Sequence, residues 1–269
     1  MVTLLKIGLI GYGAIGQDII KYINEGKAGD VMLKAVLVRR KDQYEAQISD
    51  LFYDNEEAFF ALGLDVIIEA AGHEAVYKYG KRALSSNSDF VIASVGALAD
   101  DTLLAELETA ANLNNSRIII PSAAIAGLDR VAASMLQSVD EVKLVTRKPP
   151  SAWRGTIAEE KIDLNTVKEP FCIYSGVARE SSKLFPESTN VSATLSLAGV
   201  GFDKTKVEVY VDPTITRNTH QIFVNGYFGE MEVKVQNIPS ATNPKTGYIV
   251  AMSICNALKS RTSSIVIGV

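Results

Sequence analysis

A glycine-rich turn close to the beginning of the sequence constrains the fold more than any other feature. The apolar run 5–10 enters the motif Gly11-Tyr12-Gly13-Ala14-Ile15-Gly16, and residues 17–25 follow with isoleucines spaced along one helical face. An apolar run, a glycine turn and a segment of helical periodicity predict a strand, a tight turn and a helix. The chain is therefore expected to begin with the first half of a βαβ unit.

Each glycine of this turn has a physical role in holding a dinucleotide. Gly11 permits the sharp turn, Gly13 lets the backbone approach a pyrophosphate, and Gly16 lets the helix lie close to the strand. The free N–H groups and the positive dipole end of the helix then face the anion. We therefore predict a nicotinamide dinucleotide in contact with Gly11, Gly13, Ala14, Ile15 and Gly16; a purely structural turn is the alternative.

The end of the next predicted strand bears on the choice of cofactor. Residues 31–38 form an apolar run that predicts a second parallel strand, and Arg39 and Arg40 follow it. An NAD-preferring site has an acidic residue here for the ribose 2′-hydroxyl, whereas guanidinium groups pair with a 2′-phosphate. We expect NADP to be accepted, with the preference between NAD and NADP left open. Arginines in a solvated loop are the alternative interpretation.

Strands and helices continue to alternate up to residue 121. Further strands are predicted at 65–69, 90–94 and 117–121, and helices at 50–60, 74–85 and 101–112. Such alternation is typical of a Rossmann-type, doubly wound parallel sheet and places the chain in the α/β class. His73 follows one of these strands, at the edge where such sheets bind ligands, and is interpreted as a loop histidine near the cofactor.

The sequence becomes rich in β-strand patterns from residue 142 onward. Strands are predicted at 142–147, 171–175, 207–211, 220–224 and 230–235, and a helix at 191–197 after the cap 187–190. We expect a second, α+β substrate domain over 125–239, with a largely antiparallel sheet. Residues 1–124 and 240–269 are expected to form the dinucleotide-binding domain, with a returning helix at 248–258 and an edge strand at 265–267.

Charge, hydropathy and cysteine content argue against several other classes of protein. The net charge is −4 and the pI is about 5.4, so nucleic acid is not expected as a partner. The sequence begins without a signal pattern and has no uncharged apolar window long enough for a membrane span. Cys172 and Cys255 lie far apart in apolar surroundings, so we expect buried free thiols, no metal site and a reducing cytoplasm.

A polar tract beside a predicted strand contains the best candidate for acid–base chemistry. Residues 212–220 are dense in polar groups and end at His220. An imidazole exchanges a proton near neutral pH, which the oxidation of an amine or alcohol requires as hydride leaves carbon. A structural histidine is the alternative. Neither a metal-ligand spacing nor a nucleophile elbow in the sequence competes with His220.

Three segments together resemble the L-aspartate dehydrogenase family, whose substrate domain is similar to those of dihydrodipicolinate reductase and homoserine dehydrogenase. They are residues 121–129 (PSAAIAGLD), 190–195 (NVSATL) and 212–220 (DPTITRNTH), which add to the generic motif at 11–16. The resemblance extends over nearly the whole chain. The family usually has a glycine at the position of Ala123, which is a mild departure in this sequence.

The resemblance implies an enzyme that oxidises L-aspartate with NAD or NADP to iminoaspartate, which hydrolyses to oxaloacetate and ammonia or feeds NAD biosynthesis. It also implies that Ala124 and Asn190 contact the cofactor and that His220 is the active-site residue. The substrate has two carboxylates that need cations or donors. The candidates, which the sequence leaves unranked, are Arg147, Lys148, Arg217, Ser122 and Thr219.

Two other functions remain as alternatives. One is a related reductase that acts on a semialdehyde or a cyclic imine, and the other is a non-catalytic protein that senses NAD(P). An exposed sheet face in the β-rich domain would need covering, so we also expect a homodimer through that domain.

Overall fold

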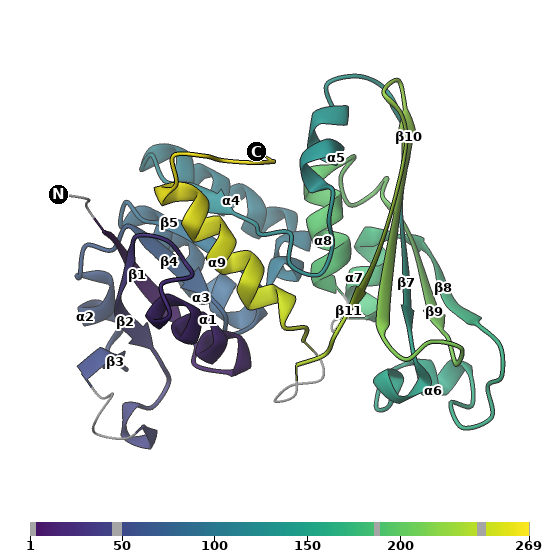
Figure 1. The fold of residues 1–269 in the computed structure, drawn as a ribbon, viewed down its shortest axis with the longest axis horizontal. Helices are drawn as coiled ribbons and strands as arrows, with labels where there is room; N and C mark the ends of the chain where they lie inside the picture. Colours follow the sequence, from purple (N-terminus) through teal and green to yellow (C-terminus); the bar gives the residue numbers. More distant parts are fainter. Residues whose placement is uncertain (1–3, 45–49, 186–188, 241–245, 269) are drawn as a thin grey trace. The chain divides into compact units, whose positions relative to one another are not determined.

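The computed structural model describes residues 4–44, 50–185, 189–240 and 246–268. The chain divides into two compact units, one of residues 1–121 with 250–269 and one of residues 122–249 (Figure 1). Part of the predicted cap at 187–190 and the pair Asn243-Pro244 before the last helix lie outside the described residues.

The first unit is built on a parallel six-stranded sheet with the order β3-β2-β1-β4-β5-β6. Ile10 pairs with Leu37 of β2 and with Glu69 of β4, so the carboxyl ends of these three strands lie side by side. The strand order reverses between β1 and β4, and this is where a doubly wound sheet binds its ligand. The strands are β1 Leu5–Ile10, β2 Val31–Leu37, β3 Phe52–Tyr53, β4 Val66–Glu69, β5 Asp89–Ile92 and β6 Ile118–Ile119.

Helices cover both faces of this sheet, as the predicted doubly wound fold requires (Figure 1). Ile19 of α1 and Ile254 of α9 share one buried cluster with Ile7 and Leu9 of β1. On the opposite face, a Cβ at Gly80 of α3 would lie 2.9 Å from Leu107 of α4 and 3.3 Å from Phe90 of β5. The helices are α1 Ala14–Asn24, α2 Glu56–Phe60, α3 His73–Ser85, α4 Asp101–Leu113 and α9 Ile249–Thr262.

A buried carboxylate fixes the end of α9 to this sheet. Asp89, at the start of β5, accepts the backbone N–H of Arg117 at 2.7 Å and its guanidinium at 3.3 Å. It also forms an ion pair with Arg261 near the end of α9. The Asp89 side chain is only 8% exposed, so its charge needs both cations. The last described helix is therefore part of the first unit's structure.

Three expectations from the sequence are wrong in detail. Residues 50–60 are not one helix, because Phe52–Tyr53 pairs with β2 and α2 begins only after the cap Asn55, whose side chain accepts the N–H of Ala58 at 3.0 Å. Residues 265–267 are exposed and form no strand. Cys172 is exposed on β8, at the edge of its sheet, whereas Cys255 is buried as expected. Short strands and edge positions leave little periodicity to detect.

The second unit contains a mixed sheet with the order β11-β10-β7-β9-β8. Neighbouring strands are antiparallel except for β7 and β9, which are parallel. The strands are β7 Val139–Lys148, β8 Phe171–Val177, β9 Lys206–Val211, β10 Asn218–Gly226 and β11 Gly229–Asn237. The helices are α5 Leu128–Ser134, α6 Ala158–Lys161, α7 Ala178–Leu184 and α8 Thr189–Ala198, with the short 3₁₀ turn η4 Pro150–Trp153.

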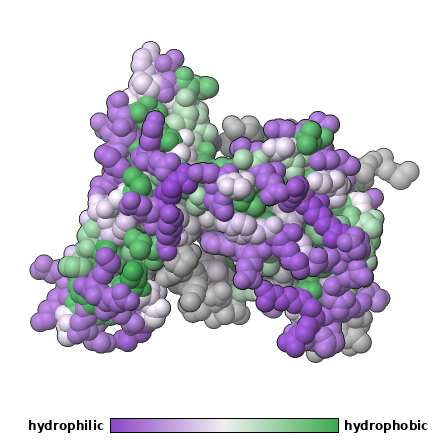
Figure 2. Space-filling model, turned by 180° about the vertical axis from the view of Figure 1, so that it is seen from behind, coloured by the Kyte–Doolittle hydropathy of each residue, from purple (hydrophilic) through white to green (hydrophobic). Residues whose placement is uncertain are grey.

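The two faces of this sheet differ in chemistry. A Cβ at Gly199, which follows α8, would lie 3.5 Å from Val131 of α5 and 3.5 Å from Val142 of β7, so this face of the sheet forms the core of the unit. The alternate residues of β7 and β9 carry ion pairs, with 2.6 Å between Lys143 and Glu208 and 2.6 Å between Lys206 and Glu141. Figure 2 shows that hydrophilic residues cover much of the side of the molecule that faces the viewer.

Among the described residues, no helix is long and apolar enough to cross a membrane.

Candidate active site

The geometry of the glycine turn fits a pyrophosphate. Gly11 has φ +99°, and a Cβ there would lie 2.7 Å from the carbonyl oxygen of Ala70. A Cβ at Gly16 would lie 2.5 Å from the carbonyl oxygen of Gly11, so the start of α1 packs directly on the turn. A Cβ at Gly13 would meet nothing within 4 Å, which leaves its backbone open to a ligand. The three positions therefore have the three roles that dinucleotide binding requires.

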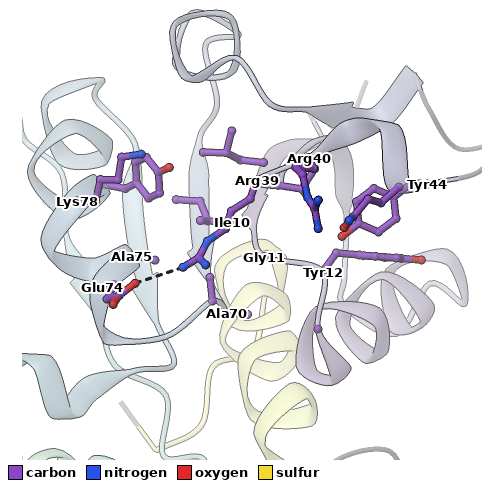
Figure 3. A pocket seen from close by; sticks show the side chains of 16 residues that line it. Ile10, Gly11, Tyr12, Arg39, Arg40, Tyr44, Ala70, Glu74, Ala75 and Lys78 are labelled. Atoms are coloured by element: carbon purple, nitrogen blue, oxygen red, sulfur yellow. Dashed lines mark hydrogen bonds and ion pairs between the residues drawn. The ribbon is translucent and has the colours of Figure 1, made fainter.

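A pocket of about 840 Å³ opens beside this turn, at the carboxyl ends of β1, β2 and β4 (Figure 3). Its volume is suited to a drug-sized or cofactor-sized molecule. Gly11, Gly13, Arg39 and Arg40 line it, whereas Ala14, Ile15 and Gly16 lie in the first turn of α1. The remaining lining residues are Ile10, Tyr12, Leu37, Val38, Gln43, Tyr44, Ala70, Ala71, Glu74, Ala75, Lys78 and Tyr79.

Arg39 and Arg40 both reach the pocket, but each already has a polar partner. The guanidinium of Arg39 extends past Ala70 to the carboxylate of Glu74, at 3.2 Å (Figure 3). Both side chains are 90% exposed, so this ion pair is weak and a stronger anion can displace it. With its amide oxygen turned toward Arg40, Gln43 accepts the Nε–H of that residue at 3.0 Å. The sequence interpretation found both arginines but missed Glu74.

The buried carboxylate of Glu69 shapes the wall of the pocket. It accepts the N–H groups of Ala71 at 2.7 Å and Gly72 at 2.8 Å, and the N–H and hydroxyl of Ser94, each at 2.9 Å. Four hydrogen bonds satisfy a side chain that solvent does not reach. Glu69 thus holds the loop after β4 against the glycine turn. In the sequence, the signal for this role of Glu69 is the presence of an acidic residue at the end of an apolar strand.

The second unit buries His220 on its sheet. His220 lies on β10 opposite Thr146 of β7, is 5% exposed, and its Nδ1 is 3.1 Å from the Thr146 hydroxyl. Burial, with an added contribution from the positive charge of Lys148, lowers the pKa of His220 from 6.5 to about 3. The imidazole is therefore neutral at physiological pH.

The tract before His220 is ordered by its own polar groups. Asp212 is buried and accepts the N–H of Thr214 at 3.0 Å, which forms the turn after β9. Its other oxygen accepts from the guanidinium of Arg147 at 3.4 Å. Thr219 donates its hydroxyl to the carbonyl oxygen of Arg217 at 3.2 Å. Most of the polarity that marks this tract in the sequence therefore serves local structure.

Ala124 and Asn190, like His220, belong to the second unit, whereas the glycine turn and the two arginines belong to the first. The carbonyl oxygen of Ala124 accepts from the side chain of Asn237 at 2.9 Å, which ties its loop to the end of β11. Asn190 is exposed in the first turn of α8, where its carbonyl oxygen accepts the hydroxyl of Thr194 at 2.8 Å.

His73, which the sequence analysis interpreted as a loop histidine, is the first residue of α3. The described residues hold no His, Cys, Asp and Glu cluster suited to a metal ion.

A parallel sheet with this glycine turn is the arrangement of a domain that binds NAD or NADP, and comparison with known proteins places the chain among the dehydrogenases that use these cofactors. Residues 11–121 match the model of the homoserine dehydrogenase NAD binding domain, and residues 129–261 match the model of the aspartate dehydrogenase C-terminal domain. The L-aspartate dehydrogenase of Methanosarcina barkeri is 38% identical over 275 residues, which cover 98% of this chain and 100% of that protein. The chain belongs to the L-aspartate dehydrogenase family.

Solved structures agree with this assignment. The crystal structure of aspartate dehydrogenase from Thermotoga maritima has a TM-score of 0.80 and 25% identity, and covers 98% of this chain and 100% of that one. Homoserine dehydrogenase of S. aureus, with a TM-score of 0.58, 16% identity and coverage of 96% and 76%, shares the fold. The resemblance seen in the sequence and the predicted fold class are therefore confirmed.

The backbone at Ala123 gives a first prediction. Its φ of +47° is a left-handed conformation that costs an alanine about 1–2 kcal/mol, and the family usually has glycine there. After the greater chain entropy of glycine is subtracted, Ala123→Gly should raise the free energy of unfolding by about 0.5–1 kcal/mol. Ala133→Gly, on the exposed side of α5, is the control and should lower it by about 1 kcal/mol. Urea unfolding of both variants checks this; a loss of stability in Ala123→Gly would contradict it.

The buried imidazole gives a second prediction. The pKa of His220 is lower in the folded protein than in the unfolded chain, so its contribution to stability is complete above about pH 6.5 and is lost as the pH falls toward about 3. The free energy of unfolding should therefore fall by about 2 kcal/mol more in the wild type than in His220→Gln between about pH 7 and about pH 5. Denaturant unfolding at both pH values measures this difference. Equal pH dependence in the two proteins would show that His220 protonates readily when folded.

Proposed function

We propose that this protein oxidises L-aspartate at the α-carbon, with NAD⁺ or NADP⁺ as the acceptor, and releases iminoaspartate. The observation that carries the proposal is the full-length similarity to relatives named L-aspartate dehydrogenase, in a chain that also has a dinucleotide pocket and a buried neutral histidine. Hydrolysis of the imine then gives oxaloacetate and ammonia, or the imine feeds NAD biosynthesis.

The first unit would hold the cofactor mainly through backbone. The turn at Gly11, Gly13 and Gly16, together with the N–H groups of Ala14 and Ile15, would bind the pyrophosphate. We also assign cofactor contacts to Ala124 and Asn190, whose N–H and side-chain groups come from the second unit. When bound, the nicotinamide ring accepts a hydride from carbon.

His220 is assigned the role of general base. If its Nδ1 carries the proton and donates to the Thr146 hydroxyl, Nε2 has a lone pair for the substrate. The substrate loses a hydride from its α-carbon and a proton from its nitrogen, and His220 receives that proton and passes it to water. The same imidazole can return a proton when water attacks the imine. Burial keeps His220 neutral before the reaction, and the same burial makes the imidazole a weaker base than in water.

We assign the homodimer contact to the face of the second unit's sheet that carries the Lys143–Glu208 and Lys206–Glu141 ion pairs. It carries charged side chains in pairs rather than a continuous apolar layer. A polar interface of this kind would have to keep those ion pairs satisfied.

A cytoplasmic location is also proposed, and it fits an exposed thiol at Cys172 and a buried one at Cys255.

The reaction is tested by the absorbance of reduced nicotinamide after the purified protein is mixed with L-aspartate and either NAD⁺ or NADP⁺. We expect absorbance to grow with L-aspartate and not with L-glutamate or L-malate. His220→Ala should lower kcat by about 10²–10⁴-fold, because general acid–base catalysis is lost. The variant should still bind the cofactor, which lies at the glycine turn. No reaction of the wild type with aspartate would overturn the proposed function, and near-normal turnover of His220→Ala would remove this residue from the mechanism.

The position of Arg39 predicts how its removal changes kcat/KM for each of the two cofactors. Arg39 can leave its exposed partner Glu74 for a 2′-phosphate, so Arg39→Ala should lower kcat/KM for NADP⁺ by about 10–100-fold. The value for NAD⁺, which has no such phosphate, should change by less than about threefold. Arg179→Ala, which removes an arginine paired with the exposed Asp203 in the second unit, is the control and should affect neither. Equal losses with both cofactors would contradict the assignment.

A further inference from the structure

We propose that Glu74 accepts a hydrogen bond from the 2′-hydroxyl of the adenosine ribose, and so enables a pocket that is rich in cations to bind NAD as well as NADP. The inference rests on the cofactor site of the proposed function, with Arg39 as the partner of a 2′-phosphate, and deepens it. It concerns the cofactor choice that the sequence left open, because Arg39 and Arg40 follow β2 where an NAD-preferring site has an acidic residue.

Cations outnumber anions in the lining of the pocket beside the glycine turn. Arg39, Arg40 and Lys78 line it, and Glu74 is the one acidic residue among the described residues that do so. A 2′-phosphate would add nearly two negative charges, which such a lining favours. NAD instead has a hydroxyl at that position, and its hydrogen needs an acceptor, which neither arginine nor lysine provides. Glu74 is the charged group of the lining that can accept it.

Glu74 approaches the end of β2 from a different part of the sheet. It is the second residue of α3, which follows β4, and its side chain points toward Arg39 across the pocket (Figure 3). The Arg39 guanidinium and the Glu74 carboxylate are 3.2 Å apart. A ligand group that meets Arg39 therefore comes within reach of Glu74. The acidic group that usually follows β2 is here supplied by the helix after β4.

The carboxylate of Glu74 can serve a ribose without leaving Arg39. An ionised carboxylate has two oxygens and about four places for donors. Arg39 donates to Oε2, and none of the described residues donates to Oε1. Both side chains are 90% exposed, so the pair can adjust to a ligand at little energetic cost. With NAD bound, Glu74 would hold the ribose hydroxyl and Arg39 together.

A 2′-phosphate changes the balance around Glu74. Arg39 then donates to the phosphate, which carries more negative charge than the carboxylate. Glu74 loses its partner and lies close to a second anion, which is unfavourable. Glu74 therefore favours a hydroxyl over a phosphate at this ribose atom, whereas Arg39 favours the phosphate. The two residues act in opposite directions on the choice of cofactor.

Glu74 also has a possible structural role, because it lies in the first turn of α3. A negative charge there stabilises the helix through its dipole. That role alone predicts a small loss of stability on removal of Glu74 and no difference between the two cofactors. The proposed role predicts changes of opposite sign for NAD and NADP, so nucleotide binding distinguishes the two.

The first test measures the dissociation constants of NAD⁺ and NADP⁺ by calorimetry, without aspartate. In Glu74→Ala, we expect the value for NAD⁺ to rise by about 10-fold and that for NADP⁺ to fall by about 2–5-fold. Glu74→Gln keeps an acceptor oxygen and removes the charge, so it should show the gain with NADP⁺ and a smaller loss with NAD⁺. Glu106→Ala removes an exposed partner of Lys81 away from the pocket lining and should change neither value by more than about twofold.

The second test identifies the ribose atom with nucleotides that have no nicotinamide. ADP and 2′-deoxy-ADP differ only in the 2′-hydroxyl. The wild type and Glu106→Ala should bind ADP about 10-fold more tightly than 2′-deoxy-ADP, because the deoxy compound cannot donate to Glu74. Glu74→Ala should bind the two compounds with similar affinity, because its acceptor is gone.

These measurements separate this inference from the proposed reaction, since no substrate is present. Equal changes for NAD⁺ and NADP⁺ in Glu74→Ala would overturn the role of Glu74, and so would a preference for ADP over 2′-deoxy-ADP that persists in this variant. A wild type that binds both cofactors and does not oxidise aspartate would overturn the proposed function while leaving the nucleotide comparison decisive for Glu74. A wild type that binds neither cofactor would overturn the assigned pocket and this inference with it.

Discussion

The close approach of two backbone segments at Gly11 is the constraint on which the first unit's binding edge depends. A side chain there would collide with the carbonyl of Ala70, so the loop after β4 could not keep its place. Glu69 holds that loop from the other side through the N–H groups of Ala71 and Gly72. The pocket therefore owes its shape to one missing side chain and one buried carboxylate.

The two units contribute different kinds of chemistry. The first presents backbone N–H groups and a helix end, which suit an anion common to all dinucleotides. The second presents side chains on one sheet face, where burial and the nearby charge of Lys148 hold His220 neutral. A neutral base and a cation can be neighbours because burial and the lysine's charge both disfavour a second proton on the imidazole.

The sequence predicts features that depend on neighbours along the chain. The glycine turn, the apolar strands and the long helices were found for this reason, and the family resemblance identified the fold and the substrate domain. Features that depend on distant partners were missed. Glu69 receives two hydrogen bonds from Ser94, which is far along the chain, and Glu74 meets Arg39 only after the sheet has formed. Phe52–Tyr53 is too short for alternation to be detected.

The position of α9 in the chain affects the order in which the protein can be completed during translation. Ala251, Ile254 and Leu258 of α9 belong to the same buried cluster as Ile7 and Leu9 of β1, and Arg261 pairs with Asp89 of β5. All of residues 122–249 are synthesised between those sheet strands and this helix. The nucleotide-binding sheet must therefore leave the ribosome with part of its apolar face uncovered, and it acquires its last helix only after the second unit has been made. Until then, that face is a surface for chaperones or for premature aggregation.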